Sequence, residues 1–326
     1  MKALRITIAI LFIIVAFIHC QNKAMKKVSF QSEGDTIKGN VYYPVKMNSG
    51  KKYPALIVVG SWTTVKEQMA GLYAQKFSKE GFITLAFDFR NYGESGGKIR
   101  FYESPQMKIQ DIKNAVTYLA TLKEVDSKKI GAFAVCAGSG YVLEAAAADK
   151  RIAAVVTAAS WLHDSEAVKM FYGGDKGVQA KIAAAKKAKQ EYKKTGKVLY
   201  VPTISKTDKK AAMYGPYDYY LNKKRGAIKE WSADKFAIMS WEDWLTFNPM
   251  PSAKKLTTPT LMIHADGAVL PTYTKKYFKN IKTSKKKLHW IKSGKKSPYE
   301  QFDFYDVKEK VSLSVSLAKK WFIKYL

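Results

Sequence analysis

Residues 130–149 read IGAFAVCAGSGYVLEAAAAD, and this stretch decides the fold. An apolar run from Ile130 ends at Cys136, small residues surround that cysteine, and an alanine-rich helical pattern follows at once. This order predicts a buried strand that turns sharply into a helix. Neighbours two positions to either side of such a turn must be small, and Ala134 and Gly138 meet that requirement.

A thiol at this turn has two interpretations. Free N–H groups at a helix N-terminus lower the pKa of a thiol and stabilise an oxyanion. They favour Cys136 as a nucleophile and the backbone N–H of Ala137 as an oxyanion donor. A buried, inert cysteine is the alternative. Ser139 is rejected as a rival nucleophile because its spacing places it inside the helix.

On both sides of the turn, apolar runs alternate with helical patterns. The runs YPALIVVG, FITLAFDF, IAAVVTAAS and TPTLMIHADG are apolar almost throughout, as expected of strands that are buried on both faces. We therefore predict an α/β fold with a mostly parallel sheet and helices on both faces. This core is expected to span residues 26–160 and 257–326.

The alternation stops in residues 161–256, which are rich in lysine and aromatic residues. We predict a lid, inserted at the carboxyl end of a strand and placed over a pocket. Tyr214 and Trp241 are candidate pocket residues in this segment. The alternative for each aromatic side chain is packing within the insertion's own small core.

Further site residues are expected at the carboxyl edge of the sheet. Asp266 ends the later strand in MIHADG and is the candidate catalytic acid. A second oxyanion donor is expected in the loop after LIVVG, at Ser61 or Trp62. Glu67 in the same loop is a candidate carboxylate partner for the thiol, and an ordinary acid at a helix N-terminus is its alternative.

From about Tyr53 to its C-terminus the chain resembles the α/β-hydrolases of the dienelactone-hydrolase-like group. The motifs that carry the resemblance are GSWTTVKEQMAGLYAQKF, LAFDFRNYGESGG, AVCAGSGY, HADGAVLP and QFDFYD. The resemblance implies a Cys nucleophile, an acid at Asp266 and oxyanion donors near Ser61, Trp62 and Ala137. It also implies a small-molecule acyl substrate, which would be an ester, a lactone or a thioester.

The chain departs from this family at the expected catalytic histidine, whose place before FDFYD is taken by Gln301. Glutamine cannot accept and return a proton near neutral pH. His163, at the carboxyl end of its strand, is a candidate replacement base, with a structural role at the start of the lid as its alternative. Two functions follow: a hydrolase with a different base, or a ligand-binding protein that has lost turnover.

The net charge of +29 indicates attraction to polyanions. Only five of the 56 basic residues are Arg, the residue that reads nucleic-acid bases through paired hydrogen bonds, so no specific nucleic-acid partner is expected. A solvated lysine-rich surface is the favoured interpretation, and docking to an anionic membrane is the alternative. No ligand spacing for a metal and no glycine-rich phosphate loop is present, so no cofactor is expected.

Residues 1–20 are expected to act as an export signal. Lys2 and Arg5 precede an apolar run from Ile6 to Ile18, which is short for a transmembrane helix. Cys20 follows directly, so the leader is also compatible with lipoprotein-type processing. An exported protein of the cell envelope is therefore predicted, with an uncleaved membrane anchor as the alternative.

Overall fold

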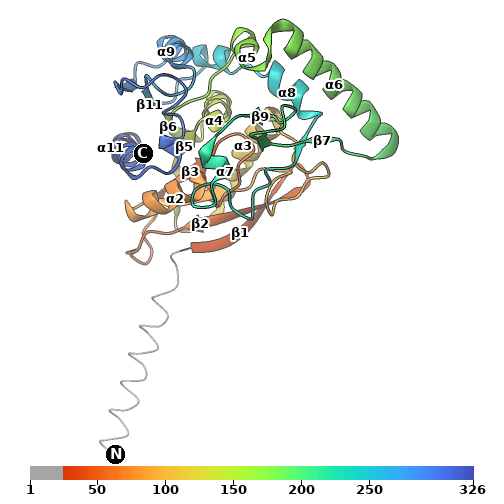
Figure 1. The fold of residues 1–326 in the computed structure, drawn as a ribbon. Coiled ribbons are helices and arrows are strands. Elements are labelled where there is room, and N and C mark those ends of the chain that lie inside the picture. The colour runs from red at the N-terminus through yellow and green to blue at the C-terminus, as the bar shows by residue number, and fades with distance from the viewer. Residues whose placement is uncertain (1–24) are drawn as a thin grey trace, which may run out of the picture.

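A computed structural model describes residues 25–326. Its centre is an eight-stranded sheet in the order β1-β2-β4-β3-β5-β6-β11-β12 (Figure 1). The first two strands form a hairpin, β2 pairs antiparallel with β4, and every later pairing is parallel. The strands are β1 (Met25–Ser32), β2 (Asp35–Tyr42), β3 (Tyr53–Val59), β4 (Ile83–Phe87), β5 (Val125–Val135), β6 (Ile152–Ala158), β11 (Thr260–Ala265) and β12 (Lys286–Ile291). The predicted mostly parallel sheet is confirmed.

Helices cover both faces of this sheet, as the alternating sequence pattern predicts. Helix α2 packs with α11 on one face, and α3 packs with α4 on the other (Figure 1). Strands buried on both sides explain why the central runs contain almost no polar residue. The core helices are α2 (Met69–Lys79), α3 (Pro105–Thr121), α4 (Ala137–Ala148), α9 (Pro271–Asn280), α10 (Asp303–Asp306) and α11 (Lys308–Tyr325).

A long segment separates β6 from β11, and we call residues 161–256 the insertion. Helix α6 projects from the body of the molecule and packs on α5 and α8 (Figure 1). Two pairs of very short strands, β7 with β10 and β8 with β9, connect the irregular parts of the insertion. The elements are α5 (Ser165–Tyr172), α6 (Gly174–Thr195), β7 (Tyr200–Val201), β8 (Ile204–Ser205), β9 (Met213–Tyr214), α7 (Asp218–Leu221), β10 (Phe236–Ala237), α8 (Ser240–Thr246) and the 3-10 helix η1 (Met250–Lys254).

The topology brings several loops to one edge. Strands β3, β5, β6 and β11 are parallel and lie side by side in that order in the sheet. Their carboxyl ends therefore meet at the same edge, where α/β proteins place their ligands. The loop after β3, the turn at Cys136 and the beginning of the insertion all start there.

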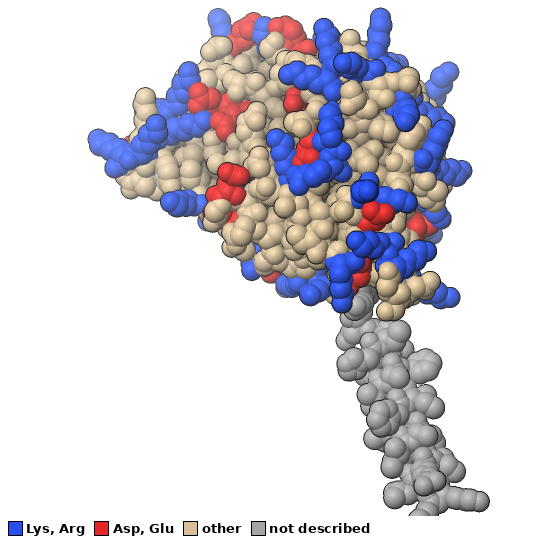
Figure 2. All heavy atoms as spheres, turned by 180° about the vertical axis from the view of Figure 1, so that it is seen from behind, with Lys and Arg blue, Asp and Glu red and all other residues tan. Residues whose placement is uncertain are grey.

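The surface carries many lysines, which are spread rather than gathered. Figure 2 shows basic side chains scattered over the whole of one face, with acidic side chains among them. Docking to an anionic membrane stays a prediction. The predicted leader and Cys20 lie outside the described residues, and within residues 25–326 no helix has the length and apolarity that crossing a membrane requires.

Candidate active site

Cys136 occupies a strained position in the tight turn between β5 and α4. Its φ is 57° and its ψ is −124°, a backbone region that residues with side chains rarely adopt. Three hydrogen bonds hold it there: Cys136 N donates to Ala158 O at 3.1 Å, and Cys136 O accepts from Trp161 N at 2.9 Å and from Ser139 N at 3.0 Å. The beginning of the insertion therefore supports the turn directly.

The small residues around this turn have a steric reason. A Cβ atom on Gly138 would lie 2.2 Å from the carbonyl oxygen of Gly60 and 2.7 Å from Val59 Cγ1. Real Cβ atoms do not approach so closely, so glycine at this position lets α4 begin against the end of β3. The loop after β3 and the turn at Cys136 consequently touch each other.

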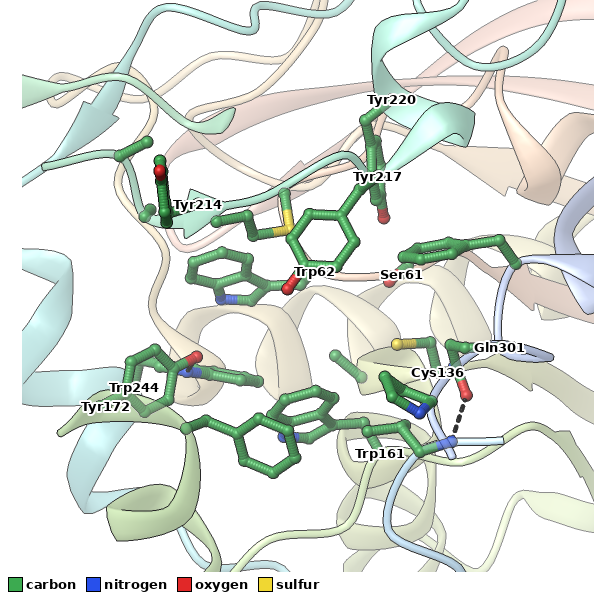
Figure 3. A pocket seen from close by; sticks show the side chains of 18 of the residues that line it. Ser61, Trp62, Cys136, Trp161, Tyr172, Tyr214, Tyr217, Tyr220, Trp244 and Gln301 are labelled. Carbon is green, nitrogen blue, oxygen red and sulfur yellow. Dashed lines mark hydrogen bonds between the residues drawn. The ribbon is translucent and has the colours of Figure 1, made fainter. Parts of the chain in front are cut away.

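A pocket of about 350 Å³ lies over Cys136, whose side chain borders it while remaining only 5% exposed (Figure 3). Ten of its 21 lining residues are aromatic, and most of these come from the insertion. The lining residues are Ser61, Trp62, Cys136, Ala137, Trp161, Phe171, Tyr172, Lys181, Lys209, Ala211, Ala212, Met213, Tyr214, Tyr217, Tyr220, Trp244, Val269, Pro298, Gln301, Phe302 and Tyr305.

The expected oxyanion residues Ser61, Trp62 and Ala137 all line this pocket beside Cys136. The indole N–H of Trp62 is buried and meets no hydrogen-bond acceptor within the described part of the chain. A buried donor without a partner costs free energy, and a substrate oxygen in the pocket would relieve that cost. Tyr214 also lines the pocket, across from Cys136 (Figure 3).

His163 requires a correction. Its Nδ1 accepts a hydrogen bond from the indole N–H of Trp161 at 2.8 Å, so Nε2 carries the proton and donates to the carbonyl of Trp244 at 3.2 Å. The side chain is buried outside the pocket lining, and burial lowers its pKa to about 4. The ring therefore has no nitrogen free to take a proton from Cys136.

Three other candidates also lie away from the pocket lining. Asp266 follows β11 at the correct edge, but its Oδ1 accepts a hydrogen bond from the indole of Trp290 at 2.6 Å. Glu67 is exposed and forms an ion pair with Lys66 at 2.7 Å. Trp241 is buried behind the pocket wall, with its ring centroid 6.1 Å from that of Trp62.

Gln301 lies beside Cys136 (Figure 3), as its place in the sequence predicts, and both polar atoms of its amide form hydrogen bonds. Its Oε1 accepts from Val269 N at 2.9 Å, and its Nε2 donates to Ala159 O at 2.8 Å. Gln301 thus joins the loops that follow β6 and β11. Neither amide atom can act as a proton acceptor for the thiol.

The sequence reasoning missed Tyr305. Its hydroxyl lies 3.1 Å from the Ser61 hydroxyl, and both hydroxyls are placed to stabilise a thiolate at Cys136. Tyr305 follows Gln301 by four residues in the QFDFYD motif, and that spacing could have identified it. Burial raises the pKa of Tyr305 well above its ordinary value, so its hydroxyl stays protonated and acts as a donor.

Opposing effects set the state of the thiol. Burial raises the pKa of Cys136 above its ordinary value, while Ser61, Tyr305, the N–H of Ala137 and Gln301 act to lower it. Burial prevails, so the resting group is a protonated thiol with donors around it. Such donors stabilise negative charge once it develops on sulfur or on a carbonyl oxygen. Among residues 25–326, no three His, Cys, Asp or Glu side chains cluster as metal ligands would.

Comparison with known proteins identifies relatives that share part of this sequence. The chain is 40% identical to the uncharacterized protein YcjY of Escherichia coli over 134 residues, which are 40% of this chain and 44% of YcjY. It is 42% identical to the uncharacterized protein PA2218 of Pseudomonas aeruginosa over 133 residues, which are 40% of this chain and 36% of PA2218. These matches therefore span less than half of either relative. The thiohydrolase aneE of Aspergillus aculeatus is 31% identical over 138 residues, 42% of each chain.

Solved structures extend the likeness to nearly the whole chain. The crystal structure of PA2218 superposes with a TM-score of 0.80 at 25% identity, covering 93% of this chain and 94% of that one. The dienelactone hydrolase of Anabaena variabilis gives a TM-score of 0.53 at 15% identity, covering 93% and 99%, which shows a shared fold. The family model described as X-Pro dipeptidyl-peptidase (S15 family) matches residues 33–294. The chain thus has an α/β-hydrolase fold and belongs to the peptidase S15 family.

Proposed function

We propose that this protein is an acyl-transferring hydrolase that uses Cys136 as its nucleophile toward a small ester, lactone or thioester. The observation that carries the proposal is the strained turn at Cys136, which presents the thiol to an aromatic pocket beside Ser61, Trp62 and Ala137. Two partial relatives support the reaction class: the thiohydrolase aneE and the acyltransferase drtE of Aspergillus calidoustus, each 31% identical over about two fifths of this chain.

Among these substrates, thioesters suit the site best because no histidine of residues 25–326 lines the pocket beside the thiol. In the first step, Cys136 Sγ bonds to the carbonyl carbon and the C–S bond of the thioester breaks. The proton of the Cys136 thiol passes to the departing thiolate, so charge balances without a separate base. The exchange replaces one thioester bond with another, so the leaving group is a thiolate that takes up the proton without a separate acid. An alkoxide leaving group is far more basic and would need an acid.

Transfer of the acyl group completes the cycle. A second thiol can attack the thioester of acylated Cys136 by the same chemistry, which releases Cys136 and carries the acyl group away. Water must be activated before it can attack. Tyr305 and Ser61, whose hydroxyls lie 3.1 Å apart, stabilise negative charge on the sulfur in either direction. We therefore expect transfer to thiols to be faster than hydrolysis.

Intact-mass spectrometry of the protein tests this proposal, with phenyl thioesters and aryl esters as acyl donors and Cys136→Ala beside the wild type. A single acyl adduct on the wild type alone, cleared faster when a small thiol is added, is the expected result. An adduct that also forms on Cys136→Ala, or none from any donor, would contradict it.

A ligand-binding protein without turnover is the second candidate, and the fixed amide of Gln301 favours it. In that case the pocket binds acyl compounds but Cys136 is not acylated. Gln301→His provides the test. A large gain of turnover in this variant over an inactive wild type would support the binding protein, whereas acylation of the wild type would rule it out.

We also propose export and attachment at the cell envelope. The basic and apolar pattern of residues 1–20 supports export, and Cys20 supports attachment through a lipid. The charge of +29 supports docking to anionic lipid. Cell fractionation of wild type and Cys20→Ala tests attachment. Binding to phosphatidylglycerol vesicles that stays constant between low and high salt would exclude electrostatic docking.

A further inference from the structure

The charged side chains of the pocket are all of one sign. Lys181 from α6 and Lys209 from the turn before β9 are the charged residues of its lining, and no Asp or Glu lines it. Both lysines belong to the insertion, whereas Cys136 and Ser61 belong to the core. Figure 3 places Tyr214, five residues after Lys209, across the pocket from Cys136.

Lys181 is half-buried yet has no carboxylate partner within the described residues. Its Nζ lies 4.5 Å from the ring centroid of Trp241. A cation above an aromatic face gains some stabilisation but no neutralising charge. Burial lowers the pKa of Lys181, as expected of an ammonium that is desolvated without a counter-ion.

Lys189 provides a comparison on the same helix. Its Nζ lies 2.7 Å from Asp243 Oδ1 and 2.8 Å from Glu242 Oε2. Burial alone would lower the pKa of Lys189, but these two carboxylates hold it well above its ordinary value. The insertion thus supplies acids to one partly buried lysine of α6 and leaves the other open to the pocket.

We propose that Lys181 and Lys209 form an anion-binding subsite, so that the acyl substrate carries a carboxylate or phosphate group in addition to its reacting carbonyl. The aromatic wall would bind the body of the substrate, and the two ammonium groups would bind the anion. This inference rests on the proposed function for the identity of the reacting group.

Cys136→Ala allows binding to be measured without chemistry. Quenching of tryptophan fluorescence reports ligand, because Trp62, Trp161 and Trp244 line the pocket. The probes are the S-phenyl monothioester of glutaric acid, with a free carboxylate on the acyl side, and its uncharged methyl ester. A second pair, S-butyryl 3-mercaptopropionate and its methyl ester, places the carboxylate on the thiol side.

In about 0.15 M salt, we expect one acid to bind about tenfold more tightly than its methyl ester, as a charge-assisted hydrogen bond provides. The pair that shows this preference identifies the side that carries the anion. Lys181→Gln and Lys209→Gln should each reduce the preference, and the double variant should abolish it. Lys181→Arg should retain it.

Matched controls separate the subsite from the general positive charge. The controls are Lys187→Gln and Lys210→Gln. Lys187 lies on α6, as Lys181 does, and Lys210 is adjacent to Lys209; both side chains are exposed and outside the pocket lining. Both should keep the full preference. Equal binding of acid and methyl ester in both pairs, or an equal loss in the controls, would overturn the inference.

Acylation of the wild type distinguishes this inference from the proposed function. If the second-order rate constant for adduct formation is the same for acid and methyl ester, the subsite is overturned and the proposed function stays intact. Preferential binding of the acid to Cys136→Ala, without acylation of the wild type by either probe, would support the subsite and contradict the proposed function.

Discussion

The carboxylate of Glu103 accepts a hydrogen bond from the backbone N–H of Thr63, with 3.1 Å between Thr63 N and Glu103 Oε2. Thr63 follows Trp62 in the loop after β3 and has a φ of 60°, a strained value for threonine. The other oxygen, Oε1, accepts from the Tyr141 hydroxyl of α4 at 2.8 Å. One buried carboxylate therefore fixes the expected oxyanion loop relative to the helix that begins after Cys136.

Glu103→Gln is expected to destabilise the fold, because the buried ammonium of Lys108, 2.7 Å from Glu103 Oε1, would lose its counter-charge. We expect the free energy of unfolding to fall by about 3–5 kcal/mol, measured by urea denaturation. The double variant Glu103→Gln/Lys108→Met should recover part of that loss. Equal stability of wild type and Glu103→Gln would refute this account of the pair.

Tyr305→Phe is expected to slow reactions of the thiol. Removal of a hydroxyl that stabilises the thiolate raises the pKa of Cys136 further, so the pH profile of alkylation by iodoacetamide should move to higher pH. At pH 7 we expect the rate to fall about tenfold, the equivalent of one pKa unit. Tyr299→Phe, at a side chain that is 76% exposed, should leave the profile unchanged. An unshifted profile in Tyr305→Phe would show that its hydroxyl does not act on the sulfur.

His163 should make the fold sensitive to acid. Its pKa is about 4 in the folded protein and 6.5 in an unfolded chain, so below pH 6.5 protons bind preferentially to the unfolded state. Its stabilising contribution is complete above pH 6.5 and declines by about 3 kcal/mol as the pH falls toward 4. Urea denaturation across this range should show a weaker pH dependence for His163→Gln than for the wild type. Identical slopes would contradict burial of a neutral imidazole.

Gly138→Ala is expected to distort the turn at Cys136. The added methyl group would meet the carbonyl of Gly60 at 2.2 Å, so the start of α4 must move away from β3. We expect loss of thioester acylation and a destabilisation of about 1–3 kcal/mol from overpacking. Gly140→Ala, on the same helix, would place its methyl group 3.3 Å from Phe247 Cε1, a contact that a small shift of this ring relieves, so its effect should be smaller. Similar effects of both substitutions would show that the contact with Gly60 is not the cause.

The sequence pattern was sufficient for the sheet and for the turn at Cys136, because buried parallel strands and a small-residue turn follow from local steric rules. It also predicted that Ser61, Trp62 and Ala137 lie at the pocket, since each comes within three residues of the end of a strand at the same edge. The positions of such residues can be predicted without knowing the structure of the insertion.

Predictions that depended on side-chain direction in irregular segments were less successful. His163 starts at the correct edge, but the indole of Trp161, two residues earlier, takes its Nδ1. Trp241 and Tyr214 belong to the same aromatic segment, yet only Tyr214 reaches the pocket. No periodic pattern distinguishes them, because packing against distant residues decides which ring faces inward.

The hydrogen bond from Trp161 N to Cys136 O also limits how the molecule can move. The insertion begins at the residue that holds the strained turn, so its first residue cannot leave the sheet edge while that bond remains. Any opening of the pocket must then flex beyond Trp161, in α5, α6 and the loops that follow. Opening of the pocket and preservation of the strained turn therefore depend on different parts of the chain.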